Sequence, residues 1–196
     1  MSKKIPGKYK GQPRNYYHYM CSAYMRSGGE ICTKHSIKND ELELEVYQKM
    51  KVYLVRHTSV DVAPGTCYGQ TDVPLRASFQ EEAEACKKAL QDTGMRFSRI
   101  YTSPLSRCTH LAAYCGFPEA ERDERLKEMN MGEWEMQRFE EITDPRIQEW
   151  YDDYLRVRTT GGESFMDVLA RVSDFLDHLD RTSGPALVFA HGGVLV

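Results

Sequence analysis

From residue 52 onward, short β-prone runs alternate with longer segments of helical periodicity, and this alternation limits the folds open to the chain. The β-prone runs resemble strands buried inside a sheet, and they cover residues 52–55, 99–102 and 186–190. Apolar residues recur at helical spacing in segments 79–90, 105–115 and 165–179. Strands that alternate with helices predict an α/β fold with three layers: a mainly parallel sheet covered by helices on both faces.

The predicted helix boundaries follow from polar and glycine residues. Ser78 and Glu81 have the spacing of a capping box, and Gly94 marks the end of that helix. Ser103 precedes a proline, which predicts a helix with serine as its N-cap. Ser164 is the expected N-cap of the clearest amphipathic helix. A further helix is predicted around residues 147–154.

The first 49 residues differ from the rest and predict a poorly ordered N-terminal extension to a domain over residues 50–196. They carry nine Lys or Arg and five Asp or Glu, whereas residues 50–196 carry seventeen and twenty-four. Four residues of this extension have pairwise spacings that zinc can use, and they are His18, Cys21, Cys32 and His35. An unstructured segment is the alternative interpretation, and we prefer it.

Composition excludes several classes of protein. The acidic main domain argues against broad nucleic-acid binding, so an anionic ligand requires a few cations focused in a pocket. No apolar run is long enough to cross a bilayer, and no signal-peptide core follows Lys3 and Lys4. We therefore expect a cytoplasmic protein, with its six cysteines present as free thiols.

Cationic and reactive side chains follow the ends of the predicted strands. Arg56 and His57 end the first strand, Arg107 lies one turn beyond the second, and His191 follows the last. The carboxyl ends of parallel strands meet at one edge of the sheet, where ligands of open α/β sheets bind. The sequence therefore predicts two imidazoles and two guanidiniums in one cleft, a set suited to phosphate.

Five ordered segments resemble the histidine phosphatase superfamily, which has the phosphoglycerate-mutase-like fold. They are residues 54–58 (LVRHT), 102–107 (TSPLSR), 126–128 (LKE) with 132–135 (GEWE), 161–164 (GGES) and 190–193 (AHGG). They occur in the family's order and extend over nearly all of residues 50–196.

The resemblance implies a role for each matching residue. His57 matches the nucleophile that becomes phosphohistidine, and His191 matches the second imidazole, which donates to the transferring phosphoryl group. Arg56 and Arg107 match the phosphate clamps, and Glu128 matches the proton donor to the leaving oxygen. A neutral imidazole can attack phosphorus, and fixed cations can hold the equatorial oxygens. The expected activity needs no metal and no cofactor.

Residues 62–75 and 103–108 are similar to the α-ribazole phosphatase branch, which implies α-ribazole 5′-phosphate as the small phosphorylated substrate. Thr58 stands where the superfamily usually has glycine, and its hydroxyl is a candidate phosphate donor. Met136 also replaces a usual glycine. The family continues beyond the His-Gly-Gly segment, so we expect the domain to lack its C-terminal end at Val196.

Two alternatives remain open at this point. A phosphoglycerate-mutase-type phosphotransferase uses the same nucleophile, although the segment between Asp92 and Gly161 is short for a dedicated mutase. The other is an inactive fragment that only binds phosphorylated ligands.

Overall fold

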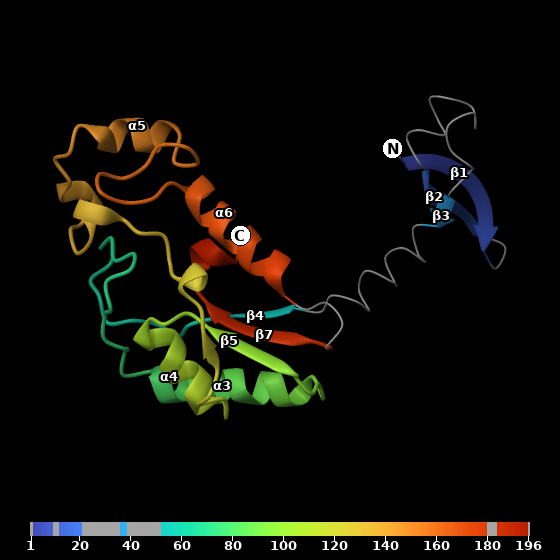
Figure 1. Cartoon of the computed structure of the whole chain (residues 1–196), viewed down its shortest axis with the longest axis horizontal. Helices are drawn as coiled ribbons and strands as arrows, with labels where there is room; N and C mark the ends of the chain where they lie inside the picture. Colours follow the sequence, from blue (N-terminus) through green and yellow to red (C-terminus); the bar gives the residue numbers. More distant parts are fainter. Residues whose placement is uncertain (1, 10–11, 21–35, 39–51, 180–183, 196) are drawn as a thin grey trace. The chain divides into compact units, whose positions relative to one another are not determined.

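The computed structural model describes residues 2–9, 12–20, 36–38, 52–179 and 184–195 of the 196-residue chain (Figure 1). The chain divides into two compact units, Met1–Lys51 and Val52–Val196. Among the described residues, no helix is both long and apolar enough to cross a membrane.

The first unit contains a three-stranded antiparallel sheet in the order β1-β2-β3. Its strands are β1 (Ser2–Tyr9), β2 (Gln12–Met20) and β3 (Ser36–Lys38). Of the four residues considered as zinc ligands, His18 lies in β2, whereas Cys21, Cys32 and His35 lie outside the described residues. The assignment of residues 1–49 as an extension of the main domain stays a prediction.

The second unit is built on a four-stranded sheet in which every pair of neighbouring strands is parallel. The strand order is β4 (Val52–Arg56), β7 (Ala186–Ala190), β5 (Arg99–Thr102) and β6 (Glu121–Arg122). All five residues of β7 are buried, as expected for a central strand of a covered parallel sheet. Strand β7, the last described strand along the sequence, therefore lies in the interior of the sheet.

Helices cover both faces of this sheet, which confirms the predicted three-layer α/β fold (Figure 1). Helices α3 (Phe79–Asp92) and α4 (Ser106–Tyr114) lie on one face, and α6 (Phe165–His178) lies on the other. Successive side chains of a strand point to opposite faces. Leu187 and Phe189 therefore pack in the cluster of α3 and α4, while Val188 and Ala190 pack in the cluster of α6.

A smaller apolar cluster packs against α5 (Arg146–Asp152). Trp134 is its centre, with its ring edge-on to Trp150 at 5.8 Å and its indole N–H donating to Asp144 at 2.8 Å. Short 3-10 turns make up the remaining elements: η1 (Glu124–Leu126), η2 (Gly132–Trp134), η3 (Phe139–Glu141) and η4 (Gly192–Val194).

Two of the three predicted helix starts are wrong in detail. Ser78 makes no capping hydrogen bond to the helix backbone, and its hydroxyl donates to Glu82 at 2.6 Å instead. Helix α4 begins at Ser106 rather than after Ser103, because Pro104 and Leu105 remain outside the helix. Ser164 is confirmed as an N-cap, although its partner in the capping box is Asp167.

Met136 has a φ of 65°, the left-handed conformation that favours glycine. This conformation costs a non-glycine residue roughly 1–2 kcal/mol, whereas glycine adds about 0.5–1 kcal/mol of unfolded-state entropy. Its side chain is 51% exposed and contributes little packing. We expect Met136→Gly to raise the free energy of unfolding by about 0.5 kcal/mol in urea denaturation. Met136→Ala keeps the strain and is expected to show no gain; an equal gain in both variants would contradict this explanation.

Candidate active site

His57 follows β4 and is held on two sides by the backbone. Its peptide N–H donates to Ala190 O at 3.1 Å, which joins the ends of β4 and β7. Its ring Nδ1 lies 2.7 Å from the carbonyl oxygen of Thr58. A carbonyl oxygen only accepts, so Nδ1 carries the proton and Nε2 keeps a lone pair. Nε2 is therefore the nucleophilic atom of this ring.

Electrostatics keep His57 neutral. Burial is the main cause that lowers its pKa from 6.5 to about 4; the hydrogen bond to the Thr58 carbonyl opposes this shift, and the nearby charges of Arg107 and Arg56 add to it. At neutral pH the imidazole is therefore neutral, with its proton on Nδ1, which is the form that can attack phosphorus through Nε2.

His191 follows the central strand β7 and has no exposed surface. Its ring centroid lies 5.1 Å from that of His57, with an interplanar angle of 58°. Arg107 Nε donates to His191 Nδ1 at 3.2 Å, so the ring proton resides on Nε2 and is donated to Ser103 Oγ at 2.7 Å. Burial, followed by the charge of Arg107, lowers the pKa of His191 far below its ordinary value. Ser103 therefore contacts a residue of the site, whereas the sequence predicts it only as a helix N-cap.

Arg107 lies in the first turn of α4 and is completely enclosed. Beyond its bond to His191, Nη1 donates to Thr71 O at 2.9 Å and Nη2 donates to Gly69 O at 2.7 Å. The loop that supplies these carbonyls therefore fixes the orientation of the guanidinium.

Glu135 holds that loop, and the sequence analysis gave it no role. Its carboxylate accepts from the backbone N–H groups of Gln70 at 2.7 Å and Thr71 at 2.6 Å, and from Met131 at 3.1 Å. A side chain at Gly69 would collide with Glu135 Oε1. Glu135 therefore positions Arg107, and through it His191. Its place in the GEWE segment is the signal that could have identified it.

Glu128 lies against the turn that follows His191. Gly193 N donates to its carboxylate at 3.3 Å, and a side chain at Gly193 would collide with Glu128 Oε1. A side chain at Gly192 would meet the Arg56 guanidinium, with 3.6 Å to Cζ. Gly193 thus allows Glu128 to approach the turn that carries His191, and Arg56 lies at ordinary contact distance from the same turn.

Arg171 of α6 fixes the segment that contains Glu128, and the sequence analysis missed it. Its guanidinium donates to the carbonyls of Lys127 at 2.6 Å and Glu128 at 3.1 Å, and pairs with Glu163 at 2.9 Å. Glu163 also accepts from Asn130 N at 2.8 Å. No sequence pattern distinguishes Arg171 from the other polar residues of an amphipathic helix.

Thr58, one of the two residues that depart from the family pattern, has a buried hydroxyl. It is 7% exposed, and its Oγ1 has no hydrogen-bond partner among the described residues. Buried hydroxyls are normally paired, so this one is available to a ligand.

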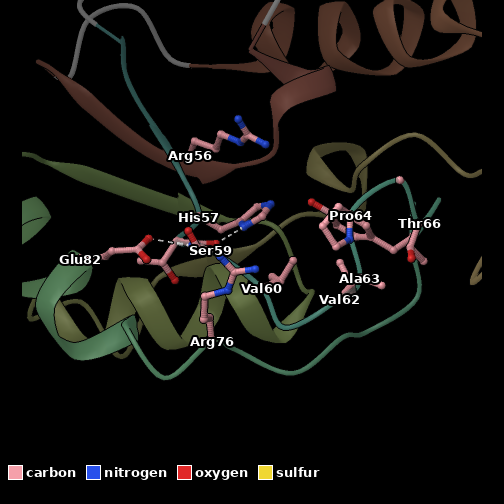
Figure 2. Close-up of a pocket in the computed structure, with 13 residues that line it drawn as sticks. Arg56, His57, Ser59, Val60, Val62, Ala63, Pro64, Thr66, Arg76 and Glu82 are labelled. Atoms are coloured by element: carbon pink, nitrogen blue, oxygen red, sulfur yellow. Dashed lines mark hydrogen bonds between the residues drawn. The ribbon is translucent and has the colours of Figure 1, made fainter. Parts of the chain in front are cut away.

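A pocket of about 400 Å³ opens beside His57 (Figure 2). Arg56 lies above the imidazole in this view, and the chain from Val62 to Thr66 forms a wall to its right. The structure thus brings all six predicted residues to one edge of the sheet: Arg56 at the last position of β4, His57 and Thr58 directly after it, and Arg107, Glu128 and His191 around the end of β7. Among the described residues, no group of three or more His, Cys, Asp and Glu is placed to hold a metal ion.

The low pKa values of His57 and His191 give a titration test. In the unfolded chain these rings take up protons near pH 6.5, whereas the folded rings stay neutral until far lower pH. We therefore expect their Cε1–H resonances to stay constant between pH 8 and about 5.5. Nuclear magnetic resonance titration, with assignments from single variants, measures this directly. A midpoint near 6.5 for either ring would contradict the electrostatic account; the same rings in denaturant serve as the reference.

Comparisons with known proteins agree with this geometry. The family model of the histidine phosphatase superfamily (branch 1) matches residues 52–196. The probable phosphoglycerate mutase GpmB of Yersinia enterocolitica is 32% identical over 158 residues, which cover 74% of this chain and 71% of that protein.

Two solved structures are similar. A protein provisionally described as an α-ribazole-5′-P phosphatase, from Escherichia coli, superposes with a TM-score of 0.68 at 27% identity, covering 74% of this chain and 75% of that one. A phosphoglycerate mutase from Thermus thermophilus superposes with a TM-score of 0.61 at 31% identity, covering 73% and 78%. The chain belongs to the histidine phosphatase superfamily, whose members are phosphatases or mutases of small phosphorylated compounds.

Proposed function

We propose that this chain is a phosphomonoesterase that works through a phosphohistidine at His57 and needs no metal ion. The observation that carries the proposal is the state of the two imidazoles. Both are neutral and lie 5.1 Å apart, and only His57 has an Nε2 lone pair without a partner among the described residues. His57 is therefore suited to attack phosphorus, and His191 is suited to donate a hydrogen bond.

The reaction proceeds in two balanced steps. His57 Nε2 forms a bond to phosphorus while the bond from phosphorus to the ester oxygen breaks, and Glu128 gives its proton to the departing oxygen. Water then attacks the phosphohistidine and passes a proton to Glu128, and the N–P bond breaks to release inorganic phosphate. His57 and Glu128 return to their initial states.

Donors around His57 hold the phosphoryl oxygens. Arg56 and the unpaired Thr58 hydroxyl line the pocket. Each terminal nitrogen of Arg107 has a second N–H beyond the one that a carbonyl accepts. His191 exchanges its hydrogen bond to Ser103 for one to a phosphoryl oxygen. Such donors stabilise charge that develops in the transition state.

The proposed substrate is α-ribazole 5′-phosphate. Two observations support it: the resemblance of residues 62–75 to the α-ribazole phosphatase branch, and the fold shared with the Escherichia coli protein described as such an enzyme. Val62, Ala63 and Pro64 also give the pocket an apolar wall, which suits a flat aromatic base.

The test is phosphate release by the purified 196-residue chain from α-ribazole 5′-phosphate, with and without a chelator. We expect turnover that the chelator does not change. Turnover of p-nitrophenyl phosphate with none of α-ribazole 5′-phosphate would reject the substrate, and loss of all turnover with chelator would reject the metal-free mechanism.

Similarity to phosphoglycerate mutases favours one further candidate, a phosphotransferase. Incubation with 3-phosphoglycerate and a bisphosphate primer separates the two activities. A hydrolase releases inorganic phosphate, whereas formation of the 2-phospho isomer without free phosphate would establish the transferase.

Thr58→Val replaces the unpaired hydroxyl with a methyl group of similar shape. We expect the free energy of unfolding to rise by about 1 kcal/mol, because an unsatisfied buried group is removed, and kcat/KM to fall roughly tenfold. Urea denaturation and steady-state kinetics measure the two effects. Thr58→Ser keeps the hydroxyl and is expected to retain kcat/KM within a few-fold. Full activity in Thr58→Val would exclude the hydroxyl as a phosphate donor.

A further inference from the structure

Arg76 supplies an unpaired guanidinium to the pocket of His57. Its backbone N–H donates to Ser59 O at 3.2 Å, and the neighbouring Leu75 bridges to Val60, so its main chain is fixed to the pocket wall. The side chain is exposed and forms no hydrogen bond or ion pair with any described residue. Figure 2 shows it on the side of His57 opposite Arg56, turned toward the cavity.

The acidic residue of the same pocket does not neutralise Arg76. Glu82 accepts from Ser59 N at 2.8 Å and from Ser78 Oγ at 2.6 Å, so each carboxylate oxygen already has a donor. Glu82 and Arg76 interact only through their charges, and this interaction is the smallest of the causes that lower the pKa of Glu82. A guanidinium that no protein group occupies is free to bind a ligand.

The pocket has room for more than a phosphoryl group. Its volume of about 400 Å³ is in the range of sites for complete small molecules. Arg107 has no exposed surface and lies against His191, on the phosphoryl side of the site, so Arg56 and Arg76 are the two exposed guanidiniums beside His57 in the described part of the chain. Arg56 lies against the Gly192 turn, close to the phosphoryl site. Arg76 is therefore available to the remainder of the substrate.

We propose that Arg76 is a specificity-determining residue, which binds the sugar of the substrate by donating to its hydroxyl and ring oxygens. The planar fork of arginine can donate to two neighbouring oxygens at once. The inference rests on the proposed function, because it assigns Arg76 to the ribosyl part of a ribosyl phosphate.

The experiment measures binding to the whole 196-residue chain that carries His57→Ala, so that no ligand is consumed. Isothermal titration calorimetry gives the Kd of α-ribazole 5′-phosphate, ribose 5-phosphate and inorganic phosphate, with and without Arg76→Ala. We expect Arg76→Ala to raise the Kd of both sugar phosphates at least about tenfold, and that of inorganic phosphate less than about twofold. Arg96→Ala, which removes an exposed arginine outside the pocket, is the matched control and is expected to change none of them.

Three results would overturn the inference. They are an unchanged Kd for the sugar phosphates in Arg76→Ala, an equal loss for inorganic phosphate, and sugar phosphates that bind the parent chain no more tightly than inorganic phosphate. Failure of the proposed function is seen separately, as absence of phosphate release from α-ribazole 5′-phosphate by the unaltered chain. In that case the role of Arg76 is still decided by ribose 5-phosphate.

Discussion

His57→Ala is expected to lower kcat for every phosphomonoester by about 10⁴-fold, because loss of a nucleophile removes the whole covalent route. Burial holds the pKa of His57 near 4, so the ring is neutral and its Nε2 lone pair is available, and the described lining of the pocket contains no other imidazole and no thiol or amine. Binding of inorganic phosphate is expected to persist, since Arg56, Arg107 and Thr58 remain. Steady-state kinetics and calorimetry measure these two effects.

The control for this variant is His178→Ala, which removes an exposed imidazole at the end of α6 and is expected to leave kcat unchanged. Circular dichroism verifies that His57→Ala remains folded. Turnover by folded His57→Ala within about tenfold of the unaltered chain would contradict nucleophilic catalysis.

Glu128→Gln is expected to slow reactions in proportion to how much the leaving group needs a proton. For α-ribazole 5′-phosphate, whose leaving group is an alkoxide, we expect kcat to fall about 10²–10³-fold. For p-nitrophenyl phosphate, whose leaving group is already stable, the fall is expected to be under roughly fivefold. Glutamine can still accept from Gly193 N, so the turn beside His191 is retained.

Glu121→Gln provides the comparison, because Glu121 is an exposed acid in β6. It is expected to leave both rates unchanged. Equal losses for the two substrates in Glu128→Gln would assign the carboxylate to positioning rather than to proton donation.

Local patterns were sufficient to predict the layers of the fold. In β7 and α6 the spacing of apolar residues is set by the local geometry of a strand or a helix. The three-layer arrangement could therefore be derived from these spacings. Helix starts were less predictable. Ser103 precedes Pro104 as an N-cap would, yet its hydroxyl lies 2.7 Å from His191, a residue 88 positions away. Long-range contacts of this kind leave no local pattern.

The same distinction applies to the site. Residues at strand ends, such as His57 and His191, are brought to one edge by topology, and topology was predictable. Glu135 and Arg171 act on other residues through backbone N–H and carbonyl groups of distant loops. The role proposed for Arg76 depends on a side chain without a hydrogen-bond or ion-pair partner among the described residues, and the sequence alone does not show this. Supporting residues therefore required the structure.

During turnover the phosphoryl group of the substrate is expected to become covalently attached to His57. The direct measurement is rapid acid-free quenching of the chain during turnover of a phosphomonoester, followed by peptide mass spectrometry under alkaline conditions. We expect one added phosphoryl group on the peptide that contains His57, and none in His57→Ala. A phosphoryl group on any other side chain, or turnover without a phosphorylated protein under conditions that trap phosphohistidine, would contradict it.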